Sequence, residues 1–208
     1  MTTSEVTGAE KLAARLNIIP IGFFGLWLGP LLMFWAQALG PLRPFDVAPP
    51  ALTAWPWLGS SLVLAICTLF LPSGWYETRP FETAGKVYRY LGVPAFRRFV
   101  TNGDLVNRAV ASRHPNYRVF RYAELRDALW RQCFQSERSH LVAFVAGAVA
   151  TAYAVQIDWH GWAIWLTASN LGANLLPVLV QRFTRARLSA LRSRKEWNLR
   201  RNGNANIA

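Results

Sequence analysis

The chain has 208 residues, of which 52% are hydrophobic and 10 are Trp, and it carries a formal net charge of +12. Such a charge suggests nucleic acid as a partner, but no recognised nucleic-acid module accompanies it, and long uncharged runs are foreign to a soluble basic protein. We therefore expect a membrane protein that binds no nucleic acid. Cys67 and Cys133 form no pattern typical of a disulfide or a metal site.

Four runs lack Asp, Glu, Lys and Arg: 17–42, 47–76, 141–157 and 159–181. Crossing a bilayer takes ~20 apolar residues in a helix. The first run is longer than the roughly 7–15 apolar residues of a signal peptide, so we expect it to be retained. We predict an all-α, polytopic protein whose single membrane domain, 1–188, has transmembrane helices near 18–39, 52–72, 138–157 and 162–182. Residues 189–208 are expected to form a basic, disordered tail.

The distribution of cations predicts the orientation of these helices. Of the 23 Lys and Arg residues, 12 lie in segment 73–140, eight lie in 182–208, and Lys11 and Arg15 precede the first span. The two loops expected on the opposite side contain only Arg43. Because Lys and Arg favour the cytoplasmic side, we expect a cell-membrane protein with both termini cytoplasmic and with anionic lipid headgroups as partners.

The region between the second and third spans, 73–137, is predicted to be helical and to lie at the cytoplasmic interface. Apolar residues repeat every three or four positions from Phe81 to Leu91, with Glu82, Lys86 and Arg89 on the other side, which indicates an amphipathic helix ending at Gly92. From Tyr122 a second apolar pattern indicates a helix that runs without a break into the third span.

Two groups of polar residues occur where a membrane helix is expected. Glu137 and His140, at positions i and i+3, place a carboxylate and an imidazole on one face at the start of the third span. Such a pair suits a general base, with Glu137 orienting His140, although it is also compatible with an ordinary interfacial helix start. A metal would need further ligands, and none is expected.

The fourth span carries an amide stripe, because Asn170, Asn174 and Gln181 are spaced by four and seven residues. Buried amides are unfavourable in hydrocarbon unless they meet polar partners. A short connection makes the third and fourth spans antiparallel neighbours, so we expect Glu137 and His140 to lie near Gln181 and Arg182.

These residues also carry a family resemblance, in three patches. They read Phe81-Glu82-x-x-Gly85-Lys86-x-Tyr88-x-x-Leu91-Gly92-Val93, then Glu137-x-x-His140, then Asn174-x-x-Pro177-x-x-x-Gln181-Arg182-x-x-Arg185-x-Arg187-Leu188. In this order, over roughly 75–190, they resemble the small membrane acyltransferases typified by glycosyl-4,4'-diaponeurosporenoate acyltransferase of carotenoid biosynthesis.

The resemblance implies transfer of a fatty acyl group, with acyl-CoA as donor substrate and no bound cofactor, to a hydroxyl of a membrane-embedded glycolipid or isoprenoid glycoside. Under this hypothesis His140 is the general base and Glu137 orients it, while Asn174 or Gln181 stabilises the acyl carbonyl. The expected substrate-binding residues are Asn170, Asn174, Gln181, Arg182, Arg185, Glu82 and Tyr88. Cations including Arg97, Arg98 and Arg187 are candidates for the donor phosphates.

Two other functions remain open on the sequence alone. The segment Arg113-His114-Pro115-Asn116-Tyr117 resembles part of the isoprenylcysteine-type methyltransferases, which use S-adenosylmethionine, but no adjacent pair of glutamates follows it. A non-catalytic lipid-binding or assembly protein would tolerate changes at Glu137 and His140. The sequence does not fix the oligomeric state.

Overall fold

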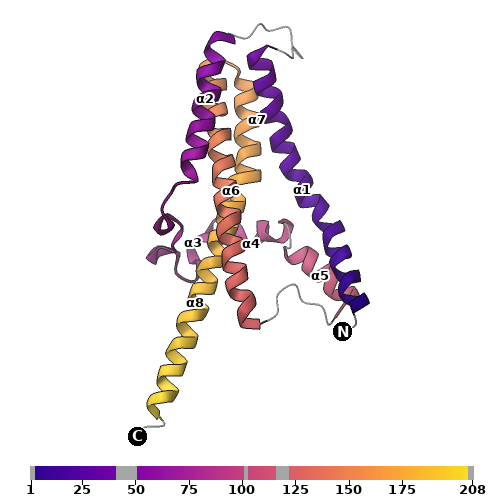
Figure 1. The fold of residues 1–208 in the computed structure, drawn as a ribbon, viewed down its shortest axis with the longest axis vertical. Coiled ribbons are helices and arrows are strands. Elements are labelled where there is room, and N and C mark those ends of the chain that lie inside the picture. The colour runs from indigo at the N-terminus through magenta and orange to yellow at the C-terminus, as the bar shows by residue number, and fades with distance from the viewer. Residues whose placement is uncertain (1–2, 41–50, 101–102, 116–121, 206–208) are drawn as a thin grey trace.

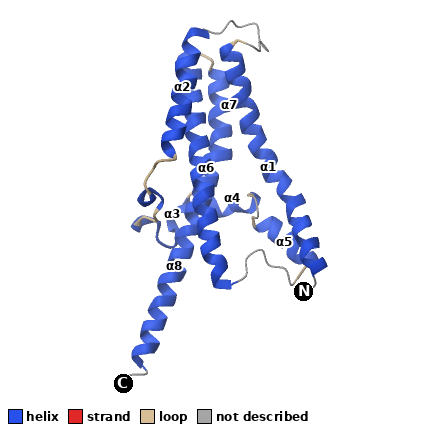
Figure 2. Ribbon diagram, in the orientation of Figure 1, coloured by secondary structure: helices blue, strands red, loops and turns tan. Residues whose placement is uncertain are grey.

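The computed structural model describes residues 3–40, 51–100, 103–115 and 122–205. Within these ranges every regular element is a helix and no strand occurs (Figure 2). The predicted all-α class is therefore confirmed.

The long helices form a bundle that opens toward one end (Figure 1). α2 (Ala51–Thr68), α6 (Tyr122–Gln156) and α7 (His160–Asn170) lie side by side, and α1 (Thr3–Leu39) leans away from them toward its N-terminus. α7 passes through a π-helical turn, Leu171–Leu175, into α8 (Leu176–Ala205). Both ends of the described chain lie at the open end of the bundle.

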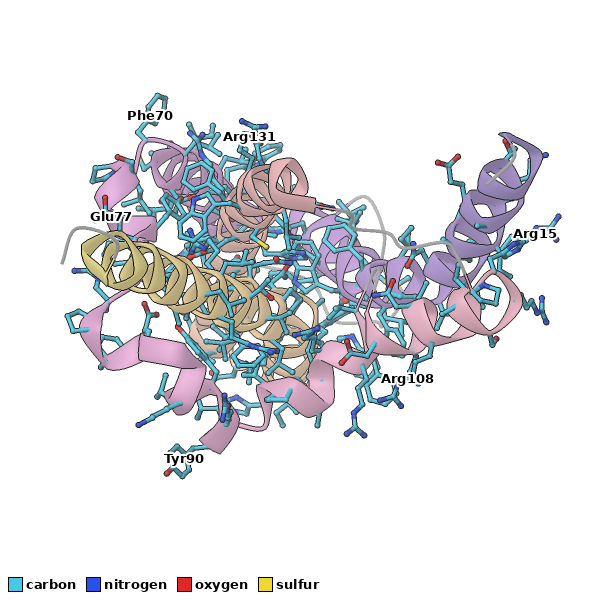
Figure 3. All side chains as sticks on the ribbon, turned by 90° about the horizontal axis from the view of Figure 1, so that it is seen from below. Arg15, Phe70, Glu77, Tyr90, Arg108 and Arg131 are labelled. Carbon is cyan, nitrogen blue, oxygen red and sulfur yellow. The ribbon has the colours of Figure 1, made fainter. Side chains whose placement is uncertain are left out.

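Six short helices connect α2 to α6 at this open end. In chain order they are the 3₁₀ turns η1 (Ser73–Tyr76) and η2 (Pro80–Gly85), then α3 (Lys86–Tyr90), α4 (Val93–Phe96), η3 (Arg97–Phe99) and α5 (Asp104–Arg113). α5 packs on the N-terminal part of α1 through Ala9, Ala13, Val106 and Val110. Arg15 and Arg108 project from this α1–α5 arm, away from the bundle (Figure 3).

Three helical stretches among the described residues are long and apolar enough to cross a membrane: Thr7–Leu39, Leu129–Gln156 and His160–Leu191. The predicted second span is different, because Thr53–Thr68 and Ser73–Glu82 meet at 85° and reach the required length only together. The described residues thus form three such helices, or four if this bent pair is one broken span.

Aromatic side chains hold the narrow end of the bundle together. Trp35 stacks on Tyr153 with ring centroids 5.8 Å apart, and Phe34 is fully buried against the same tyrosine. The Trp162 indole donates a hydrogen bond of 3.0 Å to Gln37 Oε1. Between membrane helices the apolar driving force is small, so close packing and such interhelical hydrogen bonds fix the arrangement.

α6 and α7 form the predicted antiparallel hairpin, and they touch closely at Gly147. A Cβ atom at Gly147 would lie 2.7 Å from the Asn170 amide, so only glycine lets Asn170 reach α6. There, Asn170 Nδ2 donates a hydrogen bond of 2.9 Å to the Phe144 carbonyl.

Gly147→Ala is expected to push the two helices apart and to destabilise the protein by about 1–3 kcal/mol. Gly59→Ala is the matched control, because its added methyl meets nothing within 4 Å and alanine favours a helix. Unfolding midpoints in detergent micelles measure both. Equal midpoints for the two variants would show that the contact at Gly147 has no importance for stability.

The structure corrects the prediction of one amphipathic helix over 81–91. The segment is helical, but it breaks at Gly85, whose φ of 72° is left-handed and whose Cα faces the Phe183 ring. Tyr88 is buried and Lys86 and Arg89 are exposed as predicted, but Glu82 is buried, whereas Phe81 and Leu91 are exposed. The spacing of apolar residues predicts which face of a helix a side chain occupies only if the helix is unbroken.

The structure also differs from the predicted disordered tail, because α8 continues as a helix from 189 to Ala205, and 206–208 lie outside the described residues. Arg, Leu, Lys, Ala and Glu predominate in 185–200, and all five are strong helix formers. Their local preference extends a helix that the membrane segment has already nucleated.

Candidate active site

Two carboxylates and two arginines form a buried network where α6 and α8 meet. Arg182 Nη1 donates to Glu137 Oε1 at 2.9 Å, and Arg185 Nη2 bonds the other oxygen of the same carboxylate. Arg182 Nε also donates to Glu82 Oε1 at 2.8 Å. Glu137 and Arg185 are each 1% exposed. The formal charges cancel, as buried ions require.

Glu82 enters this network from the 3₁₀ turn η2. The Tyr88 hydroxyl donates to Glu82 Oε1, and the backbone N–H of Arg79 donates to Oε2 at 2.6 Å. Burial, followed by the hydrogen bond to Glu82, raises the pKa of Tyr88 to about 12, so its hydroxyl stays protonated at neutral pH. The network therefore connects the short helices η2 and α3 to the middle of α6 and the first three turns of α8.

His140 belongs to a separate hydrogen-bonded chain. Its Nδ1 lies 3.3 Å from Asn174 Oδ1, and Asn174 Nδ2 donates at 2.8 Å to Asn170 Oδ1. Asn170 in turn donates to the Phe144 carbonyl, which can only accept. This fixed acceptor sets the orientation of both amides and leaves Asn174 Oδ1 facing the histidine.

The opposite orientation of the Asn174 amide would let its nitrogen donate to the Ala173 carbonyl and its oxygen accept from Trp27 Nε1, each at 3.2 Å, but it would also set two oxygens 2.8 Å apart at Asn170. We therefore assign the neutral His140 ring a proton on Nδ1. The lone pair is then on Nε2, so this nitrogen can take a proton from a substrate.

Pro177 supplies a second acceptor for the His140 ring. Proline has no N–H, so Pro177 cannot bond the carbonyl four residues earlier, which is that of Ala173. This carbonyl lies beside the His140 ring, where it can accept a hydrogen bond from the protonated form. The π-helical turn Leu171–Leu175 lies over the same residues, and such turns often occur at functional sites.

A largely apolar groove of about 700 Å³ lies beside His140. α1 contributes one wall, with Phe24 among its residues, α7 contributes Trp165, and η3 closes one end with Phe99. Ser136 and Gln181 are its other polar side chains from α6 and α8. Among the described residues that line the groove, His140 alone is titratable near neutral pH.

The sequence prediction that the two helix ends converge is confirmed: Glu137 contacts Arg182, and Gln181 shares the groove with His140. Glu137 and His140 do not bond each other, however. The carboxylate turns to Arg182 and Arg185, and Asn174 holds the imidazole instead.

The other predicted site residues fall into two groups. Gln181 lines the groove, whereas Asn170 and Asn174 lie behind His140. Arg182, Arg185, Glu82 and Tyr88 are bonded to one another or to Glu137, so none offers a free charge to a substrate. Sequence reasoning missed the α1 wall, the Ala173 carbonyl and Trp130, whose ring lies 5.8 Å from the Arg185 guanidinium. Of the segment that resembles methyltransferases, Asn116 and Tyr117 lie outside the described residues.

The family model for glycosyl-4,4'-diaponeurosporenoate acyltransferase matches residues 72–194. The chain belongs to this family. The match is to acyltransferases of carotenoid glycolipid biosynthesis, and it includes the buried network, His140 and the amide chain but not α1. A search of curated proteins and a search of solved structures gave no significant match.

Proposed function

We propose that the protein transfers a fatty acyl group from acyl-CoA to a sugar hydroxyl of a membrane-embedded glycolipid, with His140 as the general base. The observation that carries this proposal is the position of His140 on the wall of an apolar groove, with Nδ1–H held by Asn174. A base beside a lipid-sized groove is what the acylation of a lipid hydroxyl requires.

In the proposed reaction, Nε2 of His140 takes the proton of the acceptor hydroxyl as its oxygen attacks the thioester carbonyl. The C–O bond forms, the C–S bond breaks, and the imidazolium returns the proton to the departing thiolate. Ester and free CoA–SH are the products, so atoms and charge balance. Asn174 and the Ala173 carbonyl stabilise the transient imidazolium.

Gln181 is the better candidate of the two amides for stabilising the oxyanion. Asn174 is fully buried and already engaged with His140 and Asn170, so it positions the base and has no free donor for the acyl carbonyl. Gln181 lies on the groove wall with His140, one to two helical turns beyond the π-helical segment. An amide N–H there can donate to the developing oxyanion.

Donor phosphates are expected at the end of the groove formed by η3. Arg98 lies there between Phe96 and Phe99, both of which line the groove, whereas Arg97 is paired with Asp104 at 3.1 Å. The positive-inside distribution predicts that this end lies at the cytoplasmic face of the cell membrane, where acyl-CoA is available.

The proposal is tested by mass spectrometry of lipids from cells that make a glycosylated carotenoid acid, with and without this protein. We expect a new species heavier than the glycolipid by one fatty acyl group. An unchanged lipidome in cells with inserted protein would contradict acyl transfer and favour a scaffold. A species heavier by one methyl group would favour the methyltransferase.

A further inference from the structure

A second cavity, of about 780 Å³, lies at the narrow end of the bundle. Gly29 and Met33 of α1 face Trp159 and Trp162 of the α6–α7 turn across it. Trp165 lines both this cavity and the His140 groove. The two spaces therefore meet at a shared side chain.

Both cavities follow the seam between α1 and α7. The His140 groove takes its α1 residues from 20–26, and the second cavity takes them from 29–37. At a rise of 1.5 Å per residue, Pro20 to Gln37 spans about 26 Å. This is close to the ~30 Å thickness of a bilayer's hydrocarbon core.

We infer that these cavities are two halves of one binding site for the long isoprenoid chain of the acceptor, whose sugar end lies at His140. This inference rests on the proposed function and adds where the acceptor binds. A straight path between two antiparallel helices suits a stiff, extended polyene better than a coiled acyl chain.

The chemistry of the seam fits such an occupant. Between His140 at one end and the Asp158–His160 pair at the other, the lining described for the two cavities includes no charged side chain. Indole faces of Trp159, Trp162 and Trp165 offer flat apolar surfaces to a conjugated chain.

Glycine keeps the seam open at its middle. A Cβ atom added at Gly29 would meet nothing within 4 Å, so the position tolerates a side chain that projects into the cavity. The backbone there is ordinary α-helix, and a substitution at Gly29 fills space without straining the chain.

The experiment measures binding of a polyene glucoside about 25 Å long to the purified protein in detergent, without acyl donor, by quenching of Trp fluorescence. Gly29→Phe and, separately, Met33→Trp are expected to weaken binding at least tenfold, because each fills the narrow half of the site. Gly59→Phe, on an exposed part of α2, is the matched control.

Unchanged affinity in both seam variants would overturn the proposal, as would equal weakening in Gly59→Phe. Unfolding midpoints of all variants, measured in the same detergent, show whether a loss is local. If the protein transferred no acyl group but still bound the polyene, and if Gly29→Phe weakened that binding, the proposed function would be contradicted and this binding site would be supported.

Discussion

Replacing Glu137 by leucine is expected to destabilise the protein by about 3–5 kcal/mol, because it leaves a buried charge without its partner. Arg185 is 1% exposed, and among the described side chains its one hydrogen bond goes to Glu137. Its Nε has no hydrogen-bond partner among the described residues even in the intact protein. Arg182 retains Glu82 when Glu137 is lost, so Arg185 accounts for most of the effect.

A double variant and an exposed control test whether the unpaired charge of Arg185 causes this loss of stability. Glu137→Leu with Arg185→Leu removes both charges and is expected to recover most of the loss, since apolar pairs often replace buried ion pairs without penalty. Glu77→Leu, at the periphery of the molecule in Figure 3, is expected to change stability by less than about 0.5 kcal/mol. Unfolding midpoints measured in mixed micelles give the stability of all three variants. A Glu137→Leu protein as stable as Glu77→Leu would show that Arg185 reaches solvent.

The sequence predicts the framework of the site well, because long apolar runs and short connections leave few alternatives. The α6–α7 hairpin follows from two uncharged runs separated by a few residues, and it brings Glu137 to Arg182. The amide stripe is likewise read from spacing, and Asn170 and Asn174 are buried as expected.

Partner choice within the site is not predictable in this way. Residues at i and i+3 share a helix face, yet Glu137 and His140 bond to different groups, because two arginines compete for the carboxylate. Glu82 is placed on the wrong face because the left-handed φ of Gly85 interrupts the periodicity. The groove requires α1, whose approach to α7 over a long sequence separation leaves no local pattern.

Replacing His140 by alanine is expected to lower the rate of acyl transfer by 10²–10⁴-fold, the usual contribution of a general base. The hydrogen bond to Asn174 accounts for a small part of stability, so the variant is expected to insert and fold. The effect is expected in kcat, because in the proposed reaction His140 acts on the reacting hydroxyl whereas the lipid chains bind elsewhere along the groove.

The matched control is His114→Ala, which removes the same group from a half-buried side chain that lines neither the groove nor the second cavity. The decisive measurement is the formation of labelled ester by purified protein in lipid vesicles, supplied with isotope-labelled acyl-CoA and a carotenoid glucoside. The account predicts ester from the unaltered protein and from His114→Ala, and a loss of at least 100-fold in His140→Ala. Equal ester formation by His140→Ala and the unaltered protein would contradict it.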